Sequence, residues 1–174
     1  MEYLVIDGYN VINAWRDLFD LNNEPLEDCR EKFLNLLSNY QGFKNTKIIV
    51  VFDAHMVKGS QEKEEVFDNI TVVFTKENVT ADNYIERFVY KMGQTNKVRV
   101  VTSDYLEQRT VFRSGGIRVS PRELRQEIIK TAENLDNVMP DKGKKTNTIM
   151  SRLDPEVLER LEKLRRGEGA NNLT

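Results

Sequence analysis

Apolar and polar positions along the chain follow two different periods, which predicts strands alternating with helices. Five short runs are apolar throughout and rich in β-branched residues, as expected of strands that are buried on both faces. These runs are residues 3–7, 47–53, 70–74, 98–101 and 117–119. Such strands, joined by helices, favour an α/β fold with a central, mainly parallel sheet.

Between these runs the apolar residues recur at helical spacing. The predicted helices are residues 9–19, 26–40, 81–92 and 121–133. Thr80 is placed to cap the third helix, and Ser120 and Glu123 have the spacing of a capping box before the fourth. Residues 54–68 are polar and contain Gly59, which predicts a surface loop.

The pattern weakens after residue 135, which suggests the end of a first domain over residues 1–135. Residues 136–150 contain Pro140, Gly143 and several lysines, and they predict a basic linker or loop. Residues 151–174 predict a C-terminal helix, opening at Asp154, and a tail.

Composition narrows the class of protein. The 174 residues suffice for one hydrophobic core, and no run approaches the ~18 apolar residues of a membrane helix. The first seven residues lack the basic segment of a signal peptide, so a cytoplasmic location is expected. The single Cys29 excludes an internal disulfide or a cysteine-based zinc site, and the single His55 excludes any mechanism that needs two histidines.

The charges are unevenly distributed along the chain. Residues 1–108 hold 12 basic and 18 acidic side chains, whereas residues 109–130 hold six basic and two acidic ones. An acidic body next to a basic segment suggests a site for cations beside a surface for an anion. The alternative is that the arginines only solvate a helix and the segment leading into it.

Acidic residues stand at the ends of several predicted strands. Asp7, Asp53 and Asp104 each follow an apolar run, and the carboxyl ends of parallel strands meet at one edge of a sheet. Asp82 and Glu86 share one face of the helix that follows Thr80. Clustered carboxylates suit Mg²⁺ or Mn²⁺, and this chemistry predicts metal-assisted hydrolysis of a phosphodiester. Each acid alone is equally compatible with a turn or a helix cap.

Several ordered motifs resemble those of a known family. The opening YLVIDGYNVINAW resembles the signature of NYN domains, nuclease relatives of the PIN fold. The stretches VVFDAH, FTKENVTADNYIE and VVTSDYLEQ, and the ending DPEVLERLEKLRRG, resemble the bacterial YacP-like branch. The resemblance implies a PIN-like α/β fold, a divalent metal and endoribonuclease activity. For the YacP-like branch it also implies action on messenger RNA at the ribosome, in or near the A site. Contact with ribosomal RNA is expected, whereas DNA and a membrane are not expected as partners.

The resemblance also assigns roles to residues. Asp7, Asp82 and Asp104 match the metal-binding acids, and Asn10 matches an asparagine that orients the substrate or a water. Glu86 and Asp53 are possible additional carboxylates, and Ser103 is a candidate for positioning the attacking water. Some NYN nucleases have two adjacent acids where this chain has Asp82 and Asn83, so the resemblance leaves open whether one metal or two is held.

The predicted mechanism is attack by water on an RNA phosphodiester, leaving 5′-phosphate and 3′-hydroxyl ends. Basic residues are expected to hold the RNA backbone without reading its sequence. The candidates for this contact are Arg109, Arg113 and Arg118. Lys142, Lys144 and Lys145 are candidates for contact with ribosomal RNA, and the alternative is that these lysines are only solvated. Tyr9, Tyr105 and Phe112 are candidates for stacking on an unpaired base. The alternative for these aromatic residues is packing in the core, which is the favoured interpretation for Phe112.

Two other classes of function remain possible from the sequence. One is a module with a nuclease-like fold that binds the ribosome or RNA without cutting it. The other is a receiver-type signalling domain with Asp53 as its phosphoacceptor. That second class requires a pair of acids after the first strand and a lysine after the last, and the sequence has neither at those positions.

Overall fold

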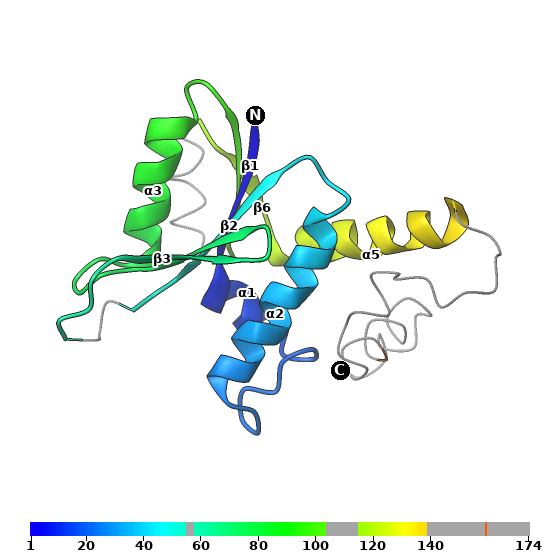
Figure 1. Cartoon of the computed structure of the whole chain (residues 1–174), viewed down its shortest axis with the longest axis horizontal. Coiled ribbons are helices and arrows are strands. Elements are labelled where there is room, and N and C mark those ends of the chain that lie inside the picture. The colour runs from blue at the N-terminus through cyan, green and yellow to red at the C-terminus, as the bar shows by residue number, and fades with distance from the viewer. Residues whose placement is uncertain (55–57, 104–114, 139–158, 160–174) are drawn as a thin grey trace.

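The structure is a computed structural model that describes residues 1–54, 58–103, 115–138 and 159 (Figure 1). The described strands and helices alternate along most of the chain, as the sequence predicted. In chain order they are β1 (Glu2–Asp7), α1 (Gly8–Ala14), α2 (Leu26–Gln41), β2 (Lys47–Phe52), β3 (Lys63–Phe67), β4 (Ile70–Phe74), α3 (Ala81–Met92), β5 (Lys97–Val101), β6 (Ile117–Val119) and α5 (Pro121–Val138).

The six strands form one sheet in the order β3-β4-β2-β1-β5-β6. Every pairing is parallel except that of β3 with β4. The predicted α/β class with a mainly parallel sheet is therefore confirmed. Because β2 and β4 extend from β1 in one direction and β5 and β6 in the other, the order of the strands reverses beside β1.

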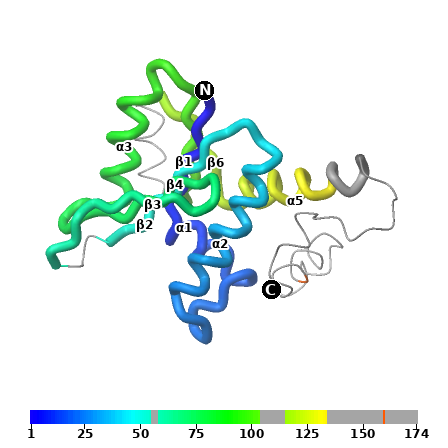
Figure 2. Tube along the Cα trace, in the orientation of Figure 1, coloured from blue at the N-terminus to red at the C-terminus, as the bar shows by residue number. Residues whose placement is uncertain are grey.

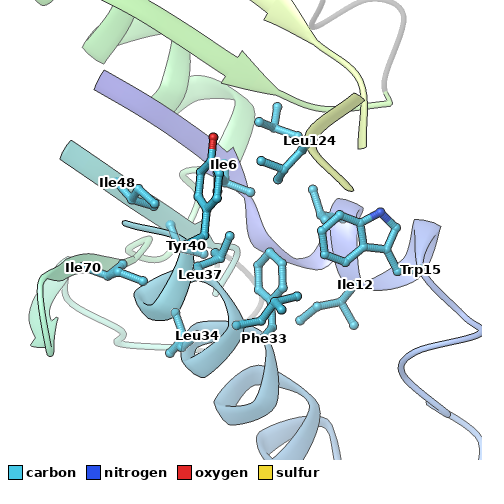
Figure 3. Packing of buried hydrophobic residues seen from close by; sticks show 14 of the residues in the cluster. Ile6, Ile12, Trp15, Phe33, Leu34, Leu37, Tyr40, Ile48, Ile70 and Leu124 are labelled. Carbon is cyan, nitrogen blue, oxygen red and sulfur yellow. The ribbon is translucent and has the colours of Figure 1, made fainter. Parts of the chain in front are cut away.

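Helices cover both faces of the sheet. Leu4 and Ile6 of β1 point to a cluster that also contains buried residues of α1, α2 and α5, and Figure 3 shows the close packing of Ile6, Trp15 and Phe33 there. The intervening Val5 points to the other face, where it packs with residues of α3. The trace in Figure 2 shows α3 apart from α1, α2 and α5. This alternation within β1 explains why its sequence is apolar throughout.

The structure corrects two predicted elements. The predicted helix 9–19 ends at Ala14, and the chain then turns, with the rings of Trp15 and Phe19 stacked at 6.4 Å between centroids. The apolar residues after Ala14 have helical spacing because they are buried, but they lie in turns and not in a helix. The predicted loop 54–68 contains strand β3, whose residues KEEVF are mostly exposed at the sheet edge and therefore show no buried periodicity.

The last described helix is longer than the sequence predicted. Helix α5 runs to Val138, past the predicted end at residue 133 and into the predicted linker. The rest of the linker 136–150 lies outside the described residues, and so does the predicted C-terminal helix apart from residue 159. No helix in the described part of the chain is long and apolar enough to cross a membrane.

A partly buried polar network joins β5, α2 and α5. The Tyr40 hydroxyl donates to Oε2 of Glu127 at 3.0 Å, and the Arg99 guanidinium pairs with both oxygens of the same carboxylate. Burial, followed by the adjacent Glu127 charge, raises the pKa of Tyr40 from 10.0 to about 12. Burial alone would raise the pKa of Glu127, but the hydrogen bonds and charge of Arg99 lower it below its ordinary value.

We expect Tyr40→Phe to lower the free energy of unfolding at pH 8 by ~1.5–3 kcal/mol, the range for a hydrogen bond to a charged group. Because the pKa of Tyr40 is raised in the folded state, its contribution is complete below pH 10.0 and is lost as the pH rises toward about 12. Urea unfolding at pH 8 and pH 11 should therefore show a smaller difference between wild type and Tyr40→Phe at pH 11. An equal difference at both pH values would contradict this explanation.

The turn from β1 into α1 leaves no room for a side chain at Gly8. A Cβ atom there would lie 2.4 Å from Cε1 of Phe52, which is itself fully buried. We expect Gly8→Ala to lower the free energy of unfolding by ~1–3 kcal/mol, as overpacking does in other cores. The control is Gly42→Ala, whose Cβ would meet no atom closer than 3.5 Å. Equal midpoints of urea unfolding for the two variants would contradict the predicted clash.

Candidate active site

Polar side chains follow each of the central parallel strands at the same edge of the sheet. Asp7 ends β1 and lies opposite Val51, so Asp53 follows two residues further along the neighbouring strand. Thr75 follows β4, and Ser103 comes two residues after the end of β5. In open parallel sheets, ligands bind at this edge, where the strand order reverses. The edge beside β1 is therefore the candidate site.

Asp7 is both the last residue of β1 and the N-cap of α1. Its backbone is extended, and its Oδ1 accepts a hydrogen bond from the Asn10 amide at 3.1 Å. This cap satisfies one of the amides that the start of a helix leaves without an intrahelical partner. The strand therefore passes directly into the helix, and the Asp7 carboxylate is held at the edge of the sheet.

Asn10 connects this helix to the end of β5. Its side-chain oxygen accepts from both the amide and the hydroxyl of Ser103, at 2.8 and 2.9 Å. The ends of β1 and β5, which lie where the order of the strands reverses, are thus joined through the side chains of Asp7, Asn10 and Ser103. Asn10 fixes the residue immediately before Asp104, while Asp104 itself lies outside the described residues.

Asp53 connects the end of β2 to the start of α3. Its Oδ1 accepts from the Thr75 hydroxyl and its Oδ2 from the Ala81 amide, both at 3.4 Å. Thr75 is fully buried, and its hydroxyl accepts a bond of 2.8 Å from the amide of Ala54. Asp53 therefore links the end of β2 to Thr75 after β4 and to the start of α3.

Helix α3 carries the other two acidic candidates. Thr80 caps it as predicted, by accepting from the Asn83 amide at 3.3 Å. Asp82 lies in the first turn, one residue beyond the amide bound by Asp53, and both Asp82 and Glu86 are exposed. The sequence analysis did not single out Thr75, although a threonine directly after an apolar strand was the available signal.

The donor set at this edge consists of oxygen atoms. The side chains placed here are those of Asp7, Asn10, Asp53 and Ser103, whereas the sulfur of Cys29 is buried within α2. Oxygen ligands fit Mg²⁺ or Mn²⁺ and do not favour a softer metal. Within the described ranges, no three His, Cys, Asp or Glu residues come together to hold a metal, and that search does not extend to Asp104.

Of the basic residues expected to contact RNA, the structure describes Arg118. It is exposed on β6 and borders a cavity of about 380 Å³ that Glu123, Glu127 and Lys130 also line. The predicted capping box is confirmed here, because the Ser120 amide and hydroxyl both donate to Glu123 at 2.6 Å. Those bonds lower the pKa of Glu123. Arg109, Arg113, Lys142, Lys144 and Lys145 lie outside the described residues.

Comparisons with known proteins identify the family. The family model of the YacP-like NYN domain matches residues 4–166. The chain is 37% identical over 169 residues to the protein named "Uncharacterized protein YacP" from Bacillus subtilis (strain 168), with 97% of this chain and 99% of that protein covered.

Solved structures show the same relationship. The crystal structure of Rae1 (YacP) from Bacillus subtilis is similar with a TM-score of 0.66 and 35% identity over 100% of both chains. A mutant form of that protein gives a TM-score of 0.66 and 34% identity, with 96% of this chain and 97% of that chain covered. With a matching sheet, a matching family model and relatives along its full length, the chain belongs to the YacP-like NYN domain family.

Proposed function

We infer that this protein is a metal-dependent endoribonuclease that cleaves messenger RNA at the ribosomal A site. The observation that carries the proposal is the hydrogen-bonded link from Asp7 through Asn10 to Ser103, at the reversal of strand order. Membership of a family related to the PIN nucleases supports it. The resemblance of the motifs to the YacP-like branch supports the ribosome as the place of action, and hence a cytoplasmic protein.

Asp7, Asp82 and Asp104 are the residues that would hold the divalent ion. A Mg²⁺ or Mn²⁺ ion bound by them would neutralise charge on the phosphate oxygens and favour the ionised form of an attacking water. Asn10 and Asp53 would position the elements that carry these ligands. Asn10 holds the main chain next to Asp104, and Asp53 holds the start of the helix that carries Asp82. Glu86, one turn further along α3, is available as an additional carboxylate.

The reaction that follows is hydrolysis of one RNA phosphodiester. Water adds to the phosphorus, the bond to the 3′ oxygen breaks, and that oxygen takes a proton. The products carry a 5′-phosphate and a 3′-hydroxyl. Arg109, Arg113 and Arg118 are the proposed contacts to the RNA backbone near the site, while Lys142, Lys144 and Lys145 are proposed to contact ribosomal RNA.

Asp7→Asn is the direct test of this function. Asparagine is also a good N-cap, so the variant is expected to keep the start of α1 while losing a carboxylate ligand. We expect at least ~100-fold slower cleavage, equivalent to losing a few kcal/mol of stabilisation by the metal. The measurement is primer-extension mapping of cuts in a message that ribosomes are translating, compared with the same RNA without ribosomes.

The matched control is Asp28→Asn, which removes an exposed carboxylate from α2 and should leave cleavage unchanged. Cuts that require both ribosomes and Asp7 would support the full proposal. Equal cutting of naked RNA would remove the ribosome from it. Ribosome binding by wild type without any cut would instead favour the non-catalytic binding module.

A further inference from the structure

A fixed arginine lies beside the candidate site, on α2. The Arg30 guanidinium carbon is 5.9 Å from the ring centre of Phe52 and 5.6 Å from that of Phe74. Its Nη1 donates to the Tyr9 hydroxyl at 2.9 Å. Tyr9 in turn packs on Phe52, with 5.0 Å between ring centres. Side chains from three other elements, α1, β2 and β4, therefore contact this one cationic side chain.

The members of this group, hereafter the Arg30 cluster (Tyr9, Arg30, Phe52 and Phe74), lie at the edge of the sheet that carries the acids. Phe52 ends β2 and Phe74 ends β4, so both are at carboxyl ends of parallel strands. Tyr9 is two residues from Asp7 and adjacent to Asn10. The cluster thus borders Asp7 on the β2 side, opposite to the β5 side where Ser103 is bound.

The charge of Arg30 is weakly compensated. Two other cations have closer carboxylate partners: Lys32 is 3.1 Å from Glu24, and Arg125 binds Asp17. Among the residues that the structure describes, the ion pair of Arg30 is with Glu27, at 3.5 Å, whose side chain is 84% exposed. An exposed pair of this kind contributes little, since water competes for both charges.

Arg30 also keeps capacity for hydrogen bonding. A guanidinium has five N–H donors, and the described contacts use one toward Tyr9 and one toward Glu27. The side chain is 24% exposed, so donors can reach a ligand without repacking. An arginine held on aromatic faces, with free donors, is suited to bidentate binding of a phosphate.

We propose that Arg30 binds a backbone phosphate of the RNA, next to the phosphate that is cut and on the β2 side of Asp7. This rests on the proposed function, because it deepens the description of the same site. The Tyr9 hydroxyl, which accepts from Arg30, donates its own hydrogen to that phosphate. The RNA then crosses the sheet edge, with Arg30 on one side of Asp7 and the predicted contacts after β5 on the other. Packing on Phe52 makes Tyr9 unsuited to stacking on a base through that face.

The test measures RNA binding in EDTA, where cleavage cannot occur, by fluorescence anisotropy of a labelled single-stranded oligonucleotide at several salt concentrations. For single strands, each phosphate contact contributes about 0.7 to the slope of log affinity against log salt. Arg30→Gln should lower the slope by about that amount and weaken binding about tenfold. Arg30→Lys should keep the slope but bind less tightly, because the fork geometry is lost.

Arg87→Gln is the matched control. Arg87 also lies over a tyrosine ring, at 5.8 Å from Tyr84, and pairs with a glutamate at 3.4 Å, but it is on α3. Arg87→Gln removes the same charge as Arg30→Gln, but it should leave the slope of log affinity against log salt unchanged. An unchanged slope in Arg30→Gln, or an equal fall in Arg87→Gln, would overturn the proposal.

A second pair of variants guards against loss of folding in Arg30→Gln. Glu27→Gln removes the exposed carboxylate that competes with phosphate for Arg30. The control is Glu31→Gln, and we expect Glu27→Gln to bind RNA about two- to threefold more tightly than this control. Equal affinities of these two variants would overturn the phosphate contact. The results also distinguish this proposal from the proposed function. A reduced salt slope in Arg30→Gln, in a protein that cuts no RNA, would refute only the nuclease function. Ribosome-dependent cutting together with an unchanged salt slope in Arg30→Gln would refute only the contact between Arg30 and phosphate.

Discussion

The hydrogen bonds from Asp7 to Asn10 and from Asn10 to Ser103 are the interactions on which the candidate site depends. Asp7 ends the central strand and caps the following helix, so no loop separates the strand from the helix and the cap holds the Asp7 carboxylate in place. Asn10 then fixes the end of β5 from the same helix. Gly8 makes the abrupt turn possible, because any Cβ there would collide with Phe52. One short segment therefore links the ends of the paired strands β1 and β5 to α1.

Two further groups of contacts connect the neighbouring strands at the same edge of the sheet. Asp53 and Thr75 join β2 and β4 to the start of α3, and the Arg30 cluster joins the same strands to α1 and α2. Asp7 and the start of the helix that carries Asp82 are consequently connected to the Arg30 cluster through β2 and β4. A carboxylate site alone would repel RNA, since both carry negative charge. In the proposed complex, the positive charge of Arg30 offsets that repulsion.

Much of the fold was predictable because its signals are local. Thr80 and the Ser120–Glu123 pair form the expected caps, and the β-branched runs form the parallel strands. Strand β3 was not predictable from its charged residues, since its pairing depends on β4 rather than on burial. The chain topology was enough to bring Asp7 and Ser103 to one edge. The contacts of Arg30 and Thr75 could not be derived, because each depends on side chains from several elements that meet only after folding.

The proposed metal site requires that acids from separate elements converge on one divalent ion at the end of β1. The most direct measurement is an anomalous-difference map from crystals of the full chain grown with Mn²⁺. We expect one strong peak coordinated by the carboxylates of Asp7, Asp82 and Asp104, and its loss in Asp7→Asn crystals of the same form. A strong peak elsewhere with none at Asp7, or an unchanged peak in Asp7→Asn, would contradict it.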